Sequence, residues 1–236
     1  MDLLSCQALT KTYSSGDSAV HAVSQVDLTF RGGEFVAITG PSGSGKSTLL
    51  HMLGGLEYPT SGKVLYQGAD LYSYNDNQLA VLRRRRFGFV FQAYNLVREL
   101  TGYENILLPV MLDHRKPDEQ YISRVIDMLD IGDRVDHLPG AMSGGQQQRI
   151  SLARALANKP SVLFADEPTG NLDGHAGREV LSLMRYVSHE LGVTLIMVTH
   201  DLAIAEQSQR IIRIEDGRIV ADSAAAPGGD SHDPAQ

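Results

Sequence analysis

The stretch Gly40-Pro-Ser-Gly-Ser-Gly-Lys-Ser-Thr48 has the spacing G-x-x-x-x-G-K-S of a phosphate-binding loop. The apolar run Phe35-Val-Ala-Ile-Thr39 has the length of a strand and precedes it. Ser47-Thr-Leu-Leu-His-Met-Leu53 follows it and reads as a helix that stops at a glycine pair. The motif requires this strand–loop–helix context. A flexible Gly/Ser linker that happens to contain a lysine is the alternative, but linkers are not framed by a buried strand and a helix.

The chemistry of the loop follows from its residue types. Its glycines let the backbone curl until N–H groups point at a phosphate, and the helix N-terminus adds partial positive charge. Lys46 supplies a mobile positive charge for the outer phosphates, and the hydroxyl of Ser47 can bind Mg²⁺. We therefore expect phosphate contacts from the whole stretch: Gly40, Pro41, Ser42, Gly43, Ser44, Gly45, Lys46, Ser47 and Thr48.

Composition limits the remaining possibilities. The 236 residues allow one large domain or two small ones, and a hydrophobic fraction of 42% is enough for a core. The formal net charge of -7 argues against nonspecific nucleic-acid binding as the main activity. Cys6 is the single cysteine, which excludes an internal disulfide and favours a reducing cytoplasm; we interpret it as a small apolar residue near the start of a strand.

Membrane and targeting signals are weak in this sequence. Residues 1–5 lack the basic start and the apolar stretch of a signal peptide. No apolar run approaches the ~20 residues that span a bilayer, and Ile106–Leu112 is short and contains a proline. We expect a soluble chain whose membrane role comes through a partner.

The pattern around the loop predicts an α/β fold. Residues 3–30 read as strands, and Val26–Phe30 alternates apolar and polar residues, as a half-exposed antiparallel strand does. The unbroken apolar runs 162–165 and 194–198 indicate parallel strands buried on both faces. Further elements are expected as a strand at 62–68, a strand at 87–91, a helix at about 175–190 and a hairpin from 211–214 and 218–220.

A helical subdomain at about 93–157 is expected as an insertion into this core, because Ile122, Val125, Ile126 and Leu129 have the spacing of an amphipathic helix. The fold class is therefore a P-loop NTPase core with an N-terminal antiparallel β subdomain and an inserted α-helical subdomain. It forms a single domain over residues 1–221, and the polar residues 222–236 are expected to be a disordered tail. The run Arg83–Arg86 is either a solvated helix face or a docking surface for an acidic partner.

A pair of carboxylates, Asp166-Glu167, follows the buried run 162–165. Such a strand delivers both side chains to the carboxyl end of a sheet, where open α/β folds bind ligands. Asp166 is a candidate Mg²⁺ ligand, and Glu167 is a candidate base that polarises an attacking water. Because adjacent carboxylates repel each other, a nearby cation would relieve them. The alternative is a surface Asp-Glu-Pro turn.

A second anion site is suggested by Met142-Ser-Gly-Gly-Gln-Gln-Gln-Arg149. Ser143 and Gln146 fit a capping box. Gly144 and Gly145 then fall in the first helical turn, where a glycine costs up to ~1 kcal/mol against alanine. That loss is explained if something must approach the bare backbone. An anion at the helix N-terminus and an ordinary cap both fit these residues.

Three other polar residues indicate a functional role less strongly. His200 directly follows the buried run 194–198 and could contact a terminal phosphate or orient Glu167, although a lone histidine is more often structural. Gln92 and Tyr13 say little by themselves. No H-E-x-x-H zinc motif and no G-x-S-x-G nucleophile elbow is evident.

These elements, in this order, resemble the ATP-binding subunit of ABC transporters over about residues 2–221. Gly40–Thr48 resembles the Walker A motif, and Val162–Asp166 resembles Walker B with Glu167 as the catalytic glutamate. Met142 departs from the usual leucine before the signature serine, but the two side chains are similar in size. The remaining matches are the signature motif at Ser143-Gly-Gly-Gln-Gln147, the D-loop at Asn171-Leu-Asp173, Gln92 of the Q-loop, the switch histidine His200 and the adenine-stacking aromatic Tyr13.

The resemblance implies ATP and Mg²⁺ as cofactors and a head-to-tail homodimer. Each ATP would lie between the Walker A loop of one subunit and Ser143, Gly144, Gly145 and Gln146 of the other. Catalytic roles are implied for Glu167, His200, Gln92 and Lys46, and metal binding for Ser47, Gln92 and Asp166. Gln92 would sense Mg²⁺ and pass the change to the helical subdomain.

The stretches 42–50, 100–109 and 166–173 resemble the group that serves lipoprotein release and macrolide or peptide efflux. This implies an ATPase that drives a separate membrane permease as an exporter or extracytoplasmic-release system, held at the cytoplasmic face of the membrane by that permease. One alternative is a soluble mechanical ATPase of translation or DNA repair. Such relatives usually carry two cassettes or a long coiled-coil insertion, which this chain lacks. Another alternative is a binding module without turnover, against which both Asp166 and Glu167 argue.

Overall fold

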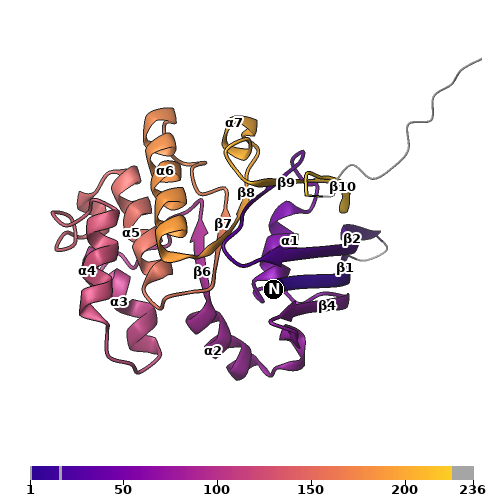
Figure 1. The fold of residues 1–236 in the computed structure, drawn as a ribbon, viewed down its shortest axis with the longest axis horizontal. Helices are drawn as coiled ribbons and strands as arrows, with labels where there is room; N and C mark the ends of the chain where they lie inside the picture. The colour runs from indigo at the N-terminus through magenta and orange to yellow at the C-terminus, as the bar shows by residue number, and fades with distance from the viewer. Residues whose placement is uncertain (1, 16–17, 225–236) are drawn as a thin grey trace, which may run out of the picture.

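Two β-sheets and a set of helices make up the part of the chain that the computed structural model describes, residues 2–15 and 18–224 (Figure 1). The strands are β1 (Asp2–Ser15), β2 (Ser18–Arg31), β3 (Phe35–Thr39), β4 (Ser61–Tyr66), β5 (Ala69–Asp70), β6 (Phe87–Phe91), β7 (Val162–Asp166), β8 (Thr194–Val198), β9 (Arg210–Glu215) and β10 (Arg218–Asp222). The helices are α1 (Lys46–Leu53), α2 (Asp76–Arg86), α3 (Gly102–Leu112), α4 (Glu119–Met128), α5 (Gly144–Leu156), α6 (Gly174–Leu191) and α7 (Leu202–Ala205).

The larger sheet has the strand order β10-β9-β3-β8-β7-β6. Its strands β9, β3, β8, β7 and β6 pair in parallel, and β10 closes one edge as the antiparallel partner of β9. The predictions of buried parallel strands at 162–165 and 194–198 and of the C-terminal hairpin are therefore confirmed. Because the strands are parallel, β3 and β7 end at the same edge of the sheet, which brings the phosphate-binding loop close to Asp166.

Two apolar cores lie on the two faces of this sheet. Successive residues of a strand point to opposite faces, so Leu195 and Met197 enter one core while Ile196 and Val198 enter the other. The first core contains residues of α3, α4, α5 and α6. The second contains α1 and the smaller antiparallel sheet, whose order is β2-β1-β4-β5. Figure 1 shows α3, α4, α5 and α6 on one side of the large sheet, and α1 with the β2-β1-β4 strands on the other.

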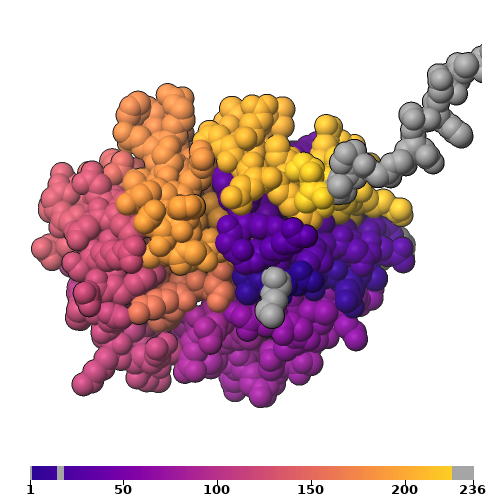
Figure 2. Space-filling view, viewed as in Figure 1, coloured from indigo at the N-terminus to yellow at the C-terminus, as the bar shows by residue number. Residues whose placement is uncertain are grey.

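The helical segment occupies one end of the molecule. Helices α3, α4 and α5 fall within residues 93–157, and Ile122, Val125 and Leu129 are buried, as the amphipathic pattern predicts. In Figure 2 the atoms coloured for residues near 100–140 gather at one side, apart from those of the N-terminal strands. The phosphate-binding loop and the start of α5 thus belong to different parts of the fold.

The arginine run forms the last turn of α2, where Arg85 and Arg86 are exposed but part of the run is also bonded within the chain. Nε of Arg84 and Nε of Arg85 donate to the carboxylate of Asp113, at 3.1 Å and 2.8 Å for the shorter contacts. The side chain of Asp113 is only 1% exposed. These bonds join α2 to the residue that ends α3, so two of the four arginines hold the helical segment against the core.

The start and end of the described chain bear on two expectations. Cys6 is buried, and burial raises the pKa of its thiol to about 12, in agreement with an inert apolar role. Asp222, assigned to the tail by the sequence analysis, is the last residue of β10, because its carboxylate accepts two hydrogen bonds from Arg210. Ser223 also exchanges hydrogen bonds with Ile211 of β9, so the start of the expected disordered tail is ordered. Residues 225–236 of that tail lie outside the described residues. Within the described ranges, every helix is too short or too polar to cross a bilayer.

Candidate functional site

Two glycines fix the path of the phosphate-binding loop. A Cβ atom on Gly45, whose φ is +98°, would lie 1.9 Å from the carbonyl oxygen of Ala22. A Cβ atom on Gly40, whose φ is +151°, would lie 2.1 Å from the carbonyl oxygen of Ile214. Residues with side chains rarely adopt these backbone conformations. The loop therefore runs in close backbone contact with β2 and β9, and side chains at these positions would displace it.

The ammonium group of Lys46 is folded into the loop. Its Nζ donates to the carbonyl oxygens of Gly40 at 3.0 Å and Pro41 at 2.7 Å, and the residue is buried. The hydroxyl of Ser44 is also buried and has no hydrogen-bond partner among the described residues. A buried polar group normally finds a partner. The loop thus holds a cation and an unused hydroxyl, both of which suit the oxygens of a phosphate.

Ser47 and Asp166, two of the proposed metal ligands, are brought together by α1 and β7. Oγ of Ser47 donates to Oδ1 of Asp166 at 2.8 Å. Among the described residues no group of three or more His, Cys, Asp or Glu side chains could hold a metal ion alone. Mg²⁺ is commonly bound by one or two protein oxygens together with substrate phosphates and water, so this oxygen pair fits Mg²⁺.

Glu167 diverges from Asp166 and meets His200. Its backbone has a φ of +47°, uncommon for a residue with a side chain, and its N–H donates to the carbonyl of Val198 at 3.0 Å. Oε2 of Glu167 lies 3.2 Å from Nδ1 of His200. The turn therefore directs the two adjacent carboxylates to different partners, which separates their charges. Backbone strain of this kind clusters at functional sites.

A hollow of about 910 Å³ joins the loop to these residues. It is large enough for a nucleotide, since ligand pockets run to roughly 300–1,000 Å³. Its lining comprises Val20, His21, Ala22, Ser42, Gly43, Gly45, Lys46, Ser47, Thr48, Glu167, His200, Asp216 and Gly217. Tyr13 is 42% exposed on β1 and pairs with Val20 in the β1–β2 hairpin, next to this lining. Its role in stacking on adenine stays a prediction.

Gln92 is held by the D-loop. Its Nε2 donates to Oδ1 of Asn171 at 3.0 Å, and Nδ2 of Asn171 donates back to the carbonyl of Gln92 at 3.0 Å. Phe91, the preceding residue, is the register partner of Asp166 in the sheet. Gln92 therefore directly follows the sheet partner of Asp166, but its amide is bonded to Asn171. Its metal and catalytic roles stay predictions.

The predicted capping box at the start of α5 is present. Oγ of Ser143 accepts from the Gln146 N–H at 3.3 Å, and Oε1 of Gln146 accepts from the Ser143 N–H at 2.9 Å. A Cβ atom on Gly144 would lie 2.6 Å from the hydroxyl of Tyr94, so the end of that side chain would have to shift. A Cβ atom on Gly145 would meet Ala176 at an ordinary 3.5 Å. The space around Gly145 therefore does not by itself require a glycine.

The signature residues and the loop do not share a cavity. None of Ser143, Gly144, Gly145 and Gln146 is in the described lining of the 910 Å³ hollow.

Asp173, at the end of the D-loop, caps α6 by accepting hydrogen bonds from the N–H groups of Ala176 and His175. These backbone hydrogen bonds hold the pKa of the Asp173 carboxyl below its ordinary value.

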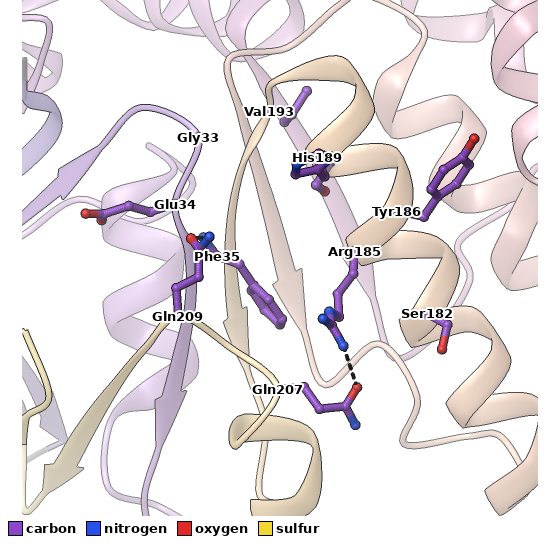
Figure 3. Close-up of a pocket in the computed structure, with 11 residues that line it drawn as sticks. Gly33, Glu34, Phe35, Ser182, Arg185, Tyr186, His189, Val193, Gln207 and Gln209 are labelled. Atoms are coloured by element: carbon purple, nitrogen blue, oxygen red, sulfur yellow. Dashed lines mark hydrogen bonds between the residues drawn. The ribbon is translucent and has the colours of Figure 1, made fainter.

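A separate hollow of about 380 Å³ lies at the opposite end of the parallel strands (Figure 3). Phe35, the first residue of β3, lines it, whereas the phosphate loop follows the last residue of β3. Figure 3 shows Arg185 of α6 directed toward Gln207, to which it donates a hydrogen bond at 3.0 Å. None of the proposed phosphate, metal or catalytic residues lines this hollow.

Residues 23–170 match the family described as ABC transporter. The chain belongs to the ABC transporter family, as its ATP-binding ATPase domain. An uncharacterized ABC transporter ATP-binding protein of Methanocaldococcus jannaschii is 44% identical over 92% of this chain and 98% of its own length. The macrolide export ATP-binding/permease protein MacB of Brucella abortus is 46% identical over 94% of this chain. The chain spans 34% of the length of that MacB protein.

Solved ABC cassettes share the fold as well. A dimeric structure of the ATP-binding cassette MJ0796, in a post-hydrolysis state bound to ADP and Pi, superposes with a TM-score of 0.83 at 39% identity. The superposition covers 93% of this chain and 97% of that one. This likeness confirms the predicted fold class of a P-loop core with an antiparallel β subdomain and an inserted helical subdomain.

Sequence reasoning missed several residues of this ABC site. His51 of α1 lies 3.1 Å from Asp166, and Asp216 and Gly217 of the β9–β10 turn line the hollow. The i, i+4 spacing of Ser47 and His51 on one helix was a usable signal for His51, because residues so spaced share a face. Asp216 and Gly217 carried no local signal, since only the pairing of β9 with β3 brings their turn to the loop.

Proposed function

We propose that two copies of this chain bind Mg²⁺-ATP head to tail, hydrolyse it, and so drive a separate membrane permease of the macrolide-efflux or lipoprotein-release type. The proposal that the chain acts as a dimer rests on one observation. The hollow beside the loop contains Lys46, Glu167 and His200, while Ser143 and Gly145 lie in another part of the same chain. A triphosphate that touches both sets therefore requires a second copy. The dimeric cassette bound to ADP and Pi supports this arrangement.

Each residue has a distinct task in the proposed reaction. The amides of the loop and the ammonium of Lys46 hold the phosphates, which releases Lys46 from its contacts with Gly40 and Pro41. Ser47 and Asp166 would hold Mg²⁺, which would supply positive charge to offset that of the phosphates. Glu167 accepts a hydrogen bond from the attacking water and makes it more nucleophilic. His200 orients Glu167 through Nδ1.

The second copy completes the site with the start of its α5. Ser143 already caps this helix, and Gly145 in its first turn is partly exposed. A helix N-terminus favours negative charge, so it can stabilise charge that develops on the γ-phosphate. ATP then binds the two copies together, and its hydrolysis weakens the contact.

The permease partner is supported by the relatives and by one surface. The archaeal relative, matched over 98% of its length, is named as an ABC transporter ATP-binding protein, whereas MacB is named as an ATP-binding/permease protein. An apolar groove of about 380 Å³ lies between α2, β6 and α3, and Leu56 and Leu112 on it are 41% and 56% exposed. We assign this groove to the permease, which would hold the chain at the cytoplasmic face of the membrane.

Two measurements test this function. The purified chain is expected to release phosphate from ATP with Mg²⁺ present and to stop when EDTA removes it. A tagged chain is expected to co-purify from membranes with an integral membrane protein, and Leu112→Asp is expected to weaken that recovery. Recovery with ribosomes or DNA in place of a membrane protein would favour the soluble mechanical ATPase. Absence of phosphate release with every partner tested would contradict the enzyme assignment.

A further inference from the structure

The side chains of Ser47 and His51, both on α1, contact the same carboxylate, that of Asp166. They are four residues apart on α1, and residues so spaced lie on the same helix face. Ser47 donates to Oδ1 of Asp166 at 2.8 Å, and Nε2 of His51 lies 3.1 Å from Oδ2 of Asp166. Each oxygen of Asp166 thus has its own neighbour on α1.

Nε2 of His51 is also a buried polar atom that lacks a well-directed hydrogen bond to any described residue. Such an atom is costly in a folded protein unless something satisfies it. The imidazole packs edge-on against Phe91, with ring centroids 6.3 Å apart at an interplanar angle of 64°. Phe91 pairs with Asp166 in the sheet and directly precedes Gln92. The ring is therefore confined between the metal-binding carboxylate and the strand that leads to Gln92.

We propose that His51 is a positioning residue that fixes the carboxylate of Asp166 for Mg²⁺. The inference rests on the proposed function, because it concerns the same metal site. One contact from Ser47 leaves a carboxylate free to rotate about its Cβ–Cγ bond. A second contact from His51 on the other oxygen restricts that rotation. Groups that hold a metal ligand in this way typically change metal affinity by about 10–100-fold when removed.

Two substitutions of His51 distinguish a positioning role for its ring nitrogen from a role in packing alone. His51→Leu keeps an apolar side chain against Phe91 and removes the ring nitrogen. His51→Gln is a comparably good helix former and returns an N–H donor near Asp166. His189→Leu is the matched control, because His189 is a histidine on α6 whose side chain is 87% exposed. Thermal unfolding of each variant checks that the fold persists.

The experiment measures binding without turnover. The affinity of each variant for a fluorescent ADP analogue is titrated against Mg²⁺ concentration, with EDTA as the metal-free limit. His51→Leu is expected to raise the Mg²⁺ concentration for half-maximal binding by about 10–100-fold. Affinity in EDTA is expected to stay unchanged, and His51→Gln and His189→Leu are expected to follow the wild type. In an Asp166→Asn background, His51→Leu is expected to add little.

The outcomes distinguish the two proposals. A wild-type chain with clear Mg²⁺ dependence and an unchanged His51→Leu variant overturns the inference and leaves the proposed function standing. Equal shifts in His51→Leu and His51→Gln also overturn it, because ring shape and not the donor would then matter. A wild-type chain whose binding ignores Mg²⁺ overturns the proposed function and this inference together.

Discussion

Oε2 of Glu167 lies 3.2 Å from Nδ1 of His200, at the ends of two neighbouring parallel strands. The turn after β7 places Glu167 in an uncommon backbone conformation and points its side chain away from Asp166. The carboxylate is thereby left facing the hollow that also holds Lys46. The two adjacent acidic residues can thus have the separate roles that we propose, Asp166 as a ligand of Mg²⁺ and Glu167 as the base for the attacking water.

Glu167→Gln is expected to lower the rate of ATP hydrolysis by about 10²–10⁴-fold, because the amide no longer accepts a proton. Nucleotide binding is expected to persist, since Lys46, Ser47 and Asp166 are untouched. Phosphate release measures the first effect. Size-exclusion chromatography with Mg²⁺-ATP measures the second, where the variant should elute as a dimer. Wild-type turnover by this variant would show that Glu167 is not the base.

Lys46→Ala is expected to weaken ATP affinity by about 10–100-fold, since a hydrogen bond to a charged group contributes roughly 1.5–3 kcal/mol. The variant also loses the hydrogen bonds of Lys46 to the carbonyls of Gly40 and Pro41 in the empty loop, so thermal unfolding is measured beside affinity. Isothermal titration with ATP measures the loss. Unchanged affinity would contradict the phosphate-binding role of the ammonium group.

Gly145→Ala tests whether α5 binds a phosphate of the second copy. A Cβ atom fits at this position, and alanine gains up to ~1 kcal/mol over glycine in a helix interior, so stability should be kept or raised. ATP-dependent dimerisation and hydrolysis are nevertheless expected to fall, because the methyl group obstructs close approach to the backbone. Sedimentation and phosphate release report these effects.

Gly144→Ala is the comparison for that test. Its Cβ atom would meet the hydroxyl of Tyr94 at 2.6 Å, so this variant should be destabilised even as a monomer without nucleotide. If Gly145→Ala instead dimerised and hydrolysed ATP like the wild type, the start of α5 would be an ordinary helix cap.

Asp113→Asn is expected to lower the free energy of unfolding by about 1.5–3 kcal/mol at neutral pH. Burial alone would raise the pKa of Asp113, but the hydrogen bonds and charges of Arg85 and Arg84 outweigh it and hold the pKa below 3.8. A lowered pKa in the folded state stabilises the protein above the unfolded-state pKa. The gain is lost as pH falls below roughly 4 toward the folded-state value.

Urea unfolding of Asp113→Asn and wild type at pH 7 and pH 3 measures this contribution. The difference between the two proteins should shrink at the lower pH. Asp133→Asn is the control, because its side chain is 69% exposed and should add little at either pH. A pH-independent difference would mean that packing, and not the ion pair, explains the effect.

Most of the fold could be predicted from local sequence patterns. The strands at 35–39, 162–165 and 194–198 are short apolar runs, and their burial on both faces follows from that pattern. The capping box at Ser143 and Gln146 was readable because both partners are three residues apart. Such features depend on neighbours in sequence.

Features that depend on residues far apart in the chain could not be predicted from the sequence. The clamp of Asp113 by Arg84 and Arg85 joins positions 28 and 29 residues apart, and no spacing rule pairs them. The hydrogen bond between the amide of Gln92 and Asn171, 79 residues away, likewise had no local signal in the sequence.

Tyr94 and Gln92 are separated by one residue, and each is anchored to a different surface. Gln92 is bonded to Asn171, while the carbonyl of Tyr94 accepts a hydrogen bond from Arg154 of α5 at 3.0 Å. Two extended residues span about 7 Å at most. This short tether leaves little slack, so in the proposed dimer a shift of Gln92 is expected to reach α5, the helix whose start we assign to the second nucleotide.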